Sequence, residues 1–180
     1  MKKRNAILVV EDAEDDALLI RRTLSKAGVP NPRRFVQSGE DAISFLRGDG
    51  RYSVRENFPL PALVLLDLKL PGMGGFEVLQ WIRSNPDLND LRVIVLTTSE
   101  NIRDVTKAYQ LGANSFLVKP LEFENIRAFV ATVDAQLSRS EPAFPAPMQM
   151  PPRTSPQEAL DQSDRRIWEF RDGVWQVISG

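Results

Sequence analysis

The segment Leu63-Val64-Leu65-Leu66-Asp67 decides the fold, because four consecutive apolar residues run directly into a carboxylate. A strand that is apolar at every position is typical of a parallel sheet with helices on both faces. Four more strand-like runs alternate with segments of helical period, the last of which covers residues 123–137: Ile7–Val10, Arg34–Gln37, Val93–Leu96 and Ser115–Val118. The pattern predicts a doubly wound α/β domain with a five-stranded parallel sheet in the flavodoxin-like order 2-1-3-4-5.

The composition fits a globular protein and excludes several kinds of site. Hydrophobic residues make up 42% and charged residues 26% of the 180 residues, and the net charge of −1 favours neither nucleic acid nor an anionic membrane as a partner. The sequence has no cysteine and no histidine, which excludes disulfides, thiolate metal sites and histidine bases. Any phosphohistidine donor must therefore be another molecule. The apolar runs are too short to span a bilayer and the N-terminus lacks a signal-peptide pattern, so we expect a cytoplasmic protein.

The composition changes beyond Ser140. Residues 141–156 hold six of the 13 prolines, which is typical of an extended linker. The sequence therefore predicts a globular domain over residues 1–140, this linker, and a C-terminal arm over residues 157–180. A capping-box pattern at residues 155–158 predicts that the arm opens with a short helix.

The arm should continue into a β-hairpin with an Asp-Gly turn at residues 172–173. The expected register pairs 171 with 174, 170 with 175 and 168 with 177, which gathers Trp168, Phe170, Trp175 and Val177 on one face. An isolated hairpin is marginally stable in water. The arm should therefore dock either on its own domain or on another protein, and the sequence leaves both alternatives open.

Four of the predicted strands end in residues that carry chemistry. Glu11 and Asp12 follow the first strand, Asp67 the third, Thr97 the fourth and Lys119 the fifth. Sites in open parallel sheets assemble at the carboxyl ends of the strands, so we expect these side chains in a single cleft. Each residue alone has a structural explanation, such as a helix N-cap for a carboxylate that follows a strand. Their joint occurrence in this order favours a shared site.

Such a cleft suits phosphoryl transfer. Neighbouring carboxylates repel one another unless a cation lies among them, and Mg²⁺ commonly binds one or two carboxylates while keeping several waters. A carboxylate can attack phosphorus as a nucleophile, while the metal ion and an ammonium group stabilise the phosphoryl oxygens. The cleft residues therefore predict Mg²⁺-dependent phosphoryl acceptance, with Lys119 and Thr97 contacting the phosphoryl oxygens.

These residues resemble a known family, the receiver domains of two-component response regulators. The resemblance covers residues from about 5 to 138, and its spacings include a proline four residues after Asp67 and a lysine 22 residues after Thr97. The matching stretches are Ile7–Asp12, Leu66–Gly75, Val95–Ser99 and Val118–Pro120. The resemblance implies a signalling protein and not an enzyme. The only chemistry of such a protein is self-catalysed phosphoryl acceptance and autodephosphorylation.

The resemblance also implies a role for each cleft residue. Asp67 is expected to be the phosphoacceptor and to bind Mg²⁺ together with Asp12. Glu11 would reach the ion through water and Lys69 through its backbone carbonyl. Lys119 would pair with the phosphoryl group.

Thr97 and Phe116 fall at the positions of the family's switch pair, in which the hydroxyl moves toward the phosphoryl group and the ring swings inward. Phe116 has no hydroxyl, so its two states would differ by packing alone, and a plain core position is the alternative. The Lys119–Pro120 bond is expected to be cis. Thr98 is bulkier than the residue many receivers carry and should narrow access to the site, and Lys69 should alter autodephosphorylation.

Two stretches, Phe45–Tyr52 and Leu96–Ser99, resemble a narrower group, the single-domain regulators that partner cyanobacterial and other bacterial phytochromes. The expected partners are a histidine kinase, specifically a phytochrome, and a second copy of the chain. The dimer would form through the helix at residues 102–111, the fifth strand and the following helix, or through the arm. Residues 141–180 carry a net charge of −2 and no recognised DNA-binding motif, so we expect no nucleic-acid partner. No membrane partner is expected either.

Two other functions are alternatives to phosphoryl acceptance. A phosphorylation-independent interaction module with the same fold is the main alternative, and the intact set of five cleft residues disfavours it. An aspartate-nucleophile hydrolase is the other. It would need an acid–base aspartate two residues after the nucleophile, where this chain has Lys69.

Overall fold

The computed structural model describes residues 6–98, 102–119, 167–171 and 174–179, and its main feature is a five-stranded parallel sheet. The strand order is β2-β1-β3-β4-β5, as predicted. The elements are β1 (Ala6–Val10), α1 (Glu14–Lys26), β2 (Arg33–Val36), α2 (Gly39–Arg47), η1 (Gly50–Tyr52), β3 (Pro61–Asp67), α3 (Gly75–Ser84), η2 (Pro86–Leu88), β4 (Arg92–Thr97), α4 (Ile102–Gln110), β5 (Ser115–Val118), β6 (Ile167–Arg171) and β7 (Val174–Ser179). The predicted strand positions are correct to within two residues at every boundary.

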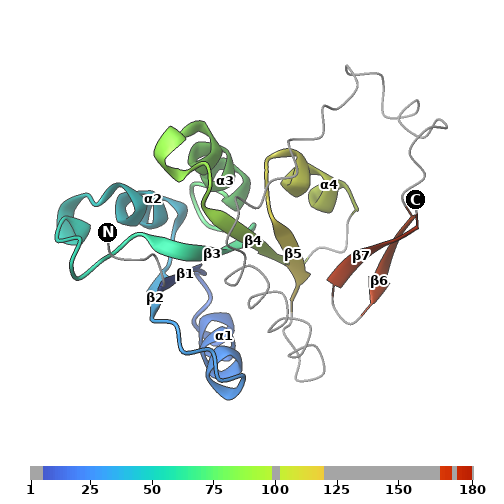
Figure 1. The fold of residues 1–180 in the computed structure, drawn as a ribbon, viewed down its shortest axis with the longest axis horizontal. Helices are drawn as coiled ribbons and strands as arrows, with labels where there is room; N and C mark the ends of the chain where they lie inside the picture. The colour runs from blue at the N-terminus through green and yellow to red at the C-terminus, as the bar shows by residue number, and fades with distance from the viewer. Residues whose placement is uncertain (1–5, 99–101, 120–166, 172–173, 180) are drawn as a thin grey trace.

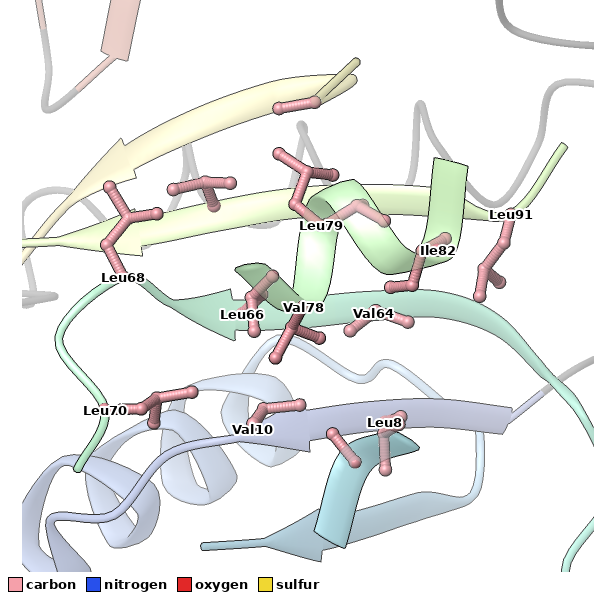
Figure 2. Packing of buried hydrophobic residues seen from close by; sticks show 14 of the residues in the cluster. Leu8, Val10, Val64, Leu66, Leu68, Leu70, Val78, Leu79, Ile82 and Leu91 are labelled. Atoms are coloured by element: carbon pink, nitrogen blue, oxygen red, sulfur yellow. The ribbon is translucent and has the colours of Figure 1, made fainter. Parts of the chain in front are cut away.

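The sheet divides the apolar interior into two cores, because successive side chains of a strand point to opposite faces. Leu8 and Val10 of β1 join the core that α2, α3 and α4 cover, whereas Ile7 and Val9 join the core that α1 covers. Figure 1 shows α1 on one side of the sheet and α2 and α3 on the other. Figure 2 shows part of the first core, where strand residues meet α3: Leu8, Val10, Val64, Leu66, Val78, Leu79 and Ile82.

The segment between α2 and β3 packs Tyr52 and Phe58 against Phe45 of α2, which forms an aromatic cluster. Their ring centroids lie 4.9 Å (Phe45–Tyr52), 5.2 Å (Tyr52–Phe58) and 6.1 Å (Phe45–Phe58) apart. The Tyr52 hydroxyl donates to Asp41 at 2.9 Å, and the Arg55 guanidinium donates to the Phe45 carbonyl at 2.8 Å. These bonds tie the segment to α2, and Arg55 adds a side-chain donor to a carbonyl in the last turn of that helix, which also accepts the Gly48 N–H.

The loop after β3 is held closely against the end of that strand. Gly75, the first residue of α3, donates its N–H to the Leu68 carbonyl at 3.1 Å. A Cβ atom at Gly75 would lie 2.2 Å from the Asp67 carbonyl oxygen, so only glycine fits here. The Met73 N–H donates to the Glu40 carboxylate at 3.0 Å, which ties the loop to α2. The loop that follows Asp67 is therefore held against the end of β3 and against α2.

Strands β6 and β7 form the antiparallel hairpin that the sequence predicts. Residue 168 pairs with 177, 170 with 175 and 171 with 174. Backbone atoms of β7 also lie near β5 of the five-stranded sheet. The predicted linker, the short helix after it, the Asp-Gly turn, the helix at residues 123–137 and the Lys119–Pro120 bond fall outside the described residues. Among the helices that are described, none is long and apolar enough to cross a membrane.

Gly75→Ala tests the close approach of α3 to Asp67. We expect it to lower the free energy of unfolding by about 1–3 kcal/mol, because the new methyl group meets backbone atoms that cannot move aside. Urea denaturation would measure the change. Gly74→Ser is the matched control, since a Cβ there meets nothing closer than 3.7 Å and its φ of −71° suits any residue. Equal stability of the two variants would contradict the prediction.

Arg83→Met tests the contact that joins α3 to the turn before β5. The half-buried guanidinium donates to the Gly112 carbonyl at 2.8 and 2.9 Å and to the Asn114 side chain at 3.1 Å. Burial lowers the pKa of Arg83 to about 10, which still leaves it charged at pH 7. Loss of these bonds should cost about 1–3 kcal/mol in urea denaturation. Arg22→Met, on the exposed side of α1, should change stability little.

Candidate functional site

The strand ends bring the predicted site residues to one edge of the sheet. The Glu11 N–H donates to the Val36 carbonyl at 3.0 Å, which fixes the chain just past β1. Asp67 closes β3 and pairs in register with Leu96 of β4. The Lys119 N–H donates to the Thr97 carbonyl at 2.7 Å, which places the lysine beside the end of β4. The order of the strands thus brings together the residues that the sequence predicts to share a site.

Lys119 is the centre of a cluster of charged side chains at this edge of the sheet. Its ammonium group donates to Glu11 at 2.6 Å, to Asp16 at 2.7 Å and to Asp67 at 2.8 Å. The side chain is only 6% exposed. An ammonium group has three N–H donors, so these three carboxylates use its full capacity.

The charges in the cleft shift the protonation equilibria of two groups. Burial by itself lowers the pKa of Lys119, but the hydrogen bonds to Asp16, Asp67 and Glu11 outweigh it, so the pKa lies above its ordinary value. Burial, helped by the nearby charge of Asp67, raises the pKa of Glu11 against the opposing effect of its bond to Lys119. Lys119 is therefore firmly cationic at pH 7, and it compensates the negative charge around it.

Three carboxylates, which we call the acidic trio, have the composition of a divalent-metal site: Glu11, Asp12 and Asp67. One oxygen from each lies within 4.8 Å of the others. Glu11 and Asp67 are buried, whereas Asp12 is exposed and faces solvent. Hard divalent cations prefer carboxylate oxygens, so the donor set fits such an ion. The side chain of Lys69 is exposed, and its backbone carbonyl as a ligand remains a prediction.

Asp67 is held at both carboxylate oxygens. Oδ1 accepts the backbone N–H of Lys69 at 2.9 Å, and Oδ2 accepts from Lys119 at 2.8 Å. The residue is 4% exposed. Two donors thus orient the carboxylate at the carboxyl end of β3. A nucleophile needs such a fixed orientation toward the atom that it attacks.

Thr97 and Phe116, the predicted switch pair, are both fully buried. Phe116 lies on β5 and belongs to the core that includes Val105 and Ala108 of α4. Its ring therefore occupies the inward position in this structure. That position agrees with the plain core alternative as well as with one of the two switch states, so the switch role stays a prediction.

Asp16 is a site residue that the sequence analysis missed. It lies in the first turn of α1, where three consecutive acidic residues satisfy the ordinary preference for negative charge at a helix N-terminus. Because this preference explains all three acidic residues, the sequence analysis did not assign Asp16 to the site. Its place in the first turn of α1, close after Asp12, makes it a candidate, but Glu14 and Asp15 share that place, so the sequence alone does not single it out.

Comparisons with known proteins agree with this geometry. The family model for the response regulator receiver domain matches residues 7–131. Response regulator Rcp1 of Synechocystis is 38% identical over 129 residues, which is 72% of this chain and 86% of that protein. Its Mn²⁺-bound crystal structure superposes with a TM-score of 0.63 at 37% identity and covers 73% of this chain and 92% of that one.

Two further solved structures are similar. The bacteriophytochrome response regulator RtBRR has a TM-score of 0.67 and 38% identity, with 83% of this chain and 86% of that chain covered. The phosphorylated cyanobacterial phytochrome response regulator RcpA has a TM-score of 0.64 and 35% identity, with 73% and 92% covered. The fold, the strand-end cleft and these matches lead to one conclusion: the chain belongs to the receiver-domain family of two-component response regulators.

Proposed function

We propose that this chain is a stand-alone response regulator that accepts a phosphoryl group on Asp67 from a histidine kinase. The observation that carries the proposal is the buried Asp67 carboxylate, oriented by Lys119 at 2.8 Å and by the Lys69 N–H at 2.9 Å. Phosphoryl acceptance in two-component signalling is the function of the family to which the chain belongs.

In the proposed reaction an Asp67 carboxylate oxygen attacks the phosphorus of a phosphohistidine on the kinase. An O–P bond forms, the P–N bond breaks, and the leaving imidazole nitrogen takes a proton to end as neutral histidine. Lys119 stabilises the charge on the phosphoryl oxygens, and Thr97 donates its hydroxyl to one of them. The chain acts on no other substrate, and hydrolysis of its own acyl phosphate ends the signal.

The metal ion is proposed to be Mg²⁺, bound by Asp12 and Asp67, through water by Glu11, and by the Lys69 carbonyl. The support is the acidic trio, whose oxygens lie within 4.8 Å of one another, and the presence of Mn²⁺ in the Rcp1 crystal structure. When bound, the ion supplies positive charge against the phosphoryl oxygens. Because no histidine or cysteine competes in the sequence, a hard cation is favoured over a softer one.

The proposed partners are a histidine kinase of the phytochrome class and a second copy of the chain, in the cytoplasm. RcpA and RtBRR, which bear the words phytochrome and bacteriophytochrome in their names, support the first. The phosphoryl group would add a charge of about −1.5 to −2. That charge would bias the surface formed by α4, β5 and the helix predicted at residues 123–137, and so change what the surface binds. The C-terminal arm, including the β6–β7 hairpin, is the second proposed contact with a partner copy.

The test of phosphoryl acceptance is intact-protein mass after incubation with Mg²⁺ and acetyl phosphate. We expect the wild type to gain one phosphoryl mass and Asp67→Asn to gain none, because the amide is not a nucleophile toward phosphorus. Asp49→Asn, an exposed change at the N-cap of η1 and outside the acidic trio, is the control and should gain the mass. Light scattering on the same samples would report self-association.

The proposal would be wrong if folded wild-type protein gained no mass with acetyl phosphate and also gained none with an active histidine kinase. The phosphorylation-independent interaction module would then be the better description. A gain that persists in Asp67→Asn would move the phosphoacceptor to another residue.

Asp12→Asn tests the metal site. We expect it to weaken Mg²⁺ binding by about tenfold or more, because one anionic ligand is lost while the fold is kept. Isothermal titration calorimetry with Mg²⁺, and with Mn²⁺ as a second probe, would measure the affinity. Asp49→Asn should bind as the wild type does, and unchanged affinity in Asp12→Asn would remove Asp12 from the site.

A further inference from the structure

Asp16 makes a contact that the proposed phosphoryl chemistry does not use. Its carboxylate accepts a hydrogen bond from the Lys119 ammonium at 2.7 Å, across a sequence separation of 103 residues. We propose that Asp16 is a positioning residue, which holds Lys119 in the unphosphorylated state and competes with the phosphoryl group for it. The inference rests on the proposed acceptance of a phosphoryl group at Asp67.

The competition follows from the number of donors on Lys119. Its three N–H groups are all used, by Glu11, Asp16 and Asp67. A phosphoryl oxygen can therefore gain a bond from Lys119 only if one carboxylate gives up its own. The acyl phosphate of Asp67 keeps a carbonyl oxygen that can still accept from Lys119. If Lys119 keeps that bond, the partner that it releases is either Glu11 or Asp16.

Exposure decides which of the two is released. The Glu11 side chain is 0% exposed, so without Lys119 it would be a buried charge with too few partners. The Asp16 side chain is 37% exposed, so water can hydrate its carboxylate once Lys119 leaves. Asp16 is therefore the partner that Lys119 leaves at the lowest cost in free energy.

The position of Asp16 separates this role from metal binding. Asp16 lies in α1, whereas the acidic trio comes from the segment after β1 and from the end of β3. Asp16 thus adds negative charge that acts on the lysine from the helix side. Removal of that charge should free Lys119 for the phosphoryl group and leave the trio intact.

The experiment measures the affinity for beryllofluoride, a phosphoryl mimic, in the presence of Mg²⁺ by isothermal titration calorimetry. Asp16→Asn keeps the shape of the side chain and an oxygen acceptor but loses the charge. Since a charge-assisted hydrogen bond exceeds a neutral one by about 1 kcal/mol, we expect the dissociation constant of Asp16→Asn to fall roughly fivefold. The acyl phosphate of Asp16→Asn should also live longer than that of the wild type.

Two control variants isolate the effect. Asp15→Asn makes the same chemical change one residue earlier, at an exposed position outside the three bonds of Lys119, and should bind as the wild type does. Asp16→Glu keeps the charge and should also bind as the wild type does. Urea denaturation checks that each variant is folded.

Unchanged or weaker beryllofluoride binding by folded Asp16→Asn would overturn the inference. Tenfold weaker binding of Mg²⁺ alone in this variant would also overturn it, because Asp16 would then be a metal ligand. Failure of the wild type itself to bind beryllofluoride would instead overturn the phosphoryl-acceptor function, and the inference with it.

Discussion

The ammonium group of Lys119, surrounded by three carboxylates, is the interaction on which the site depends. Charges that leave water pay a large desolvation cost, which only close pairing and complete hydrogen bonding offset. Here each N–H of the ammonium has its own carboxylate, at 2.6 to 2.8 Å. Removal of Lys119 would leave Glu11 and Asp67 as buried anions beside one another. The cluster is stable only as a unit.

The sheet makes that unit possible. Lys119 and Asp67 are 52 residues apart in the chain, and Lys119 and Glu11 are 108 apart. Their side chains meet because β1, β3 and β5 run in the same direction and end at the same edge. A parallel sheet of this order therefore supplies the charged cluster with a rigid frame, and the two cores on its faces hold the strands in register.

Much of the fold and of the site follows from local patterns in the sequence. Runs such as Leu63–Leu66 are apolar at every position because both faces of β3 are buried, so the strands can be predicted from the sequence. The site residues can be predicted as well, because they stand directly after these runs. The hairpin register also follows from the Asp-Gly pair at residues 172–173 of the sequence. These features depend on neighbours in the chain or on the general rules of parallel sheets.

Asp16 and the aromatic cluster depend on long-range contacts and could not be predicted in the same way. The bond from Lys119 to Asp16 is set by the angle at which α1 leaves the cleft, and no periodicity encodes that angle. Phe45, Tyr52 and Phe58 form a cluster only because Arg55 and Asp41 hold the segment against α2. The role of Phe116 could not be predicted either, because the sequence does not distinguish a switch aromatic on β5 from an ordinary core aromatic.

The division of the interior by the sheet has an evolutionary consequence. Phe116 and Val118 contact the core under α2, α3 and α4, whereas Leu117 contacts the core under α1. A substitution that changes side-chain volume in one core is accommodated by side chains that do not touch the other core. The effects of distant substitutions on the free energy of unfolding are nearly additive. A lineage of such proteins can therefore remodel the α1 face and the α4 face at separate times. Only the residues at the strand ends, where both faces meet the charged cluster, must change together.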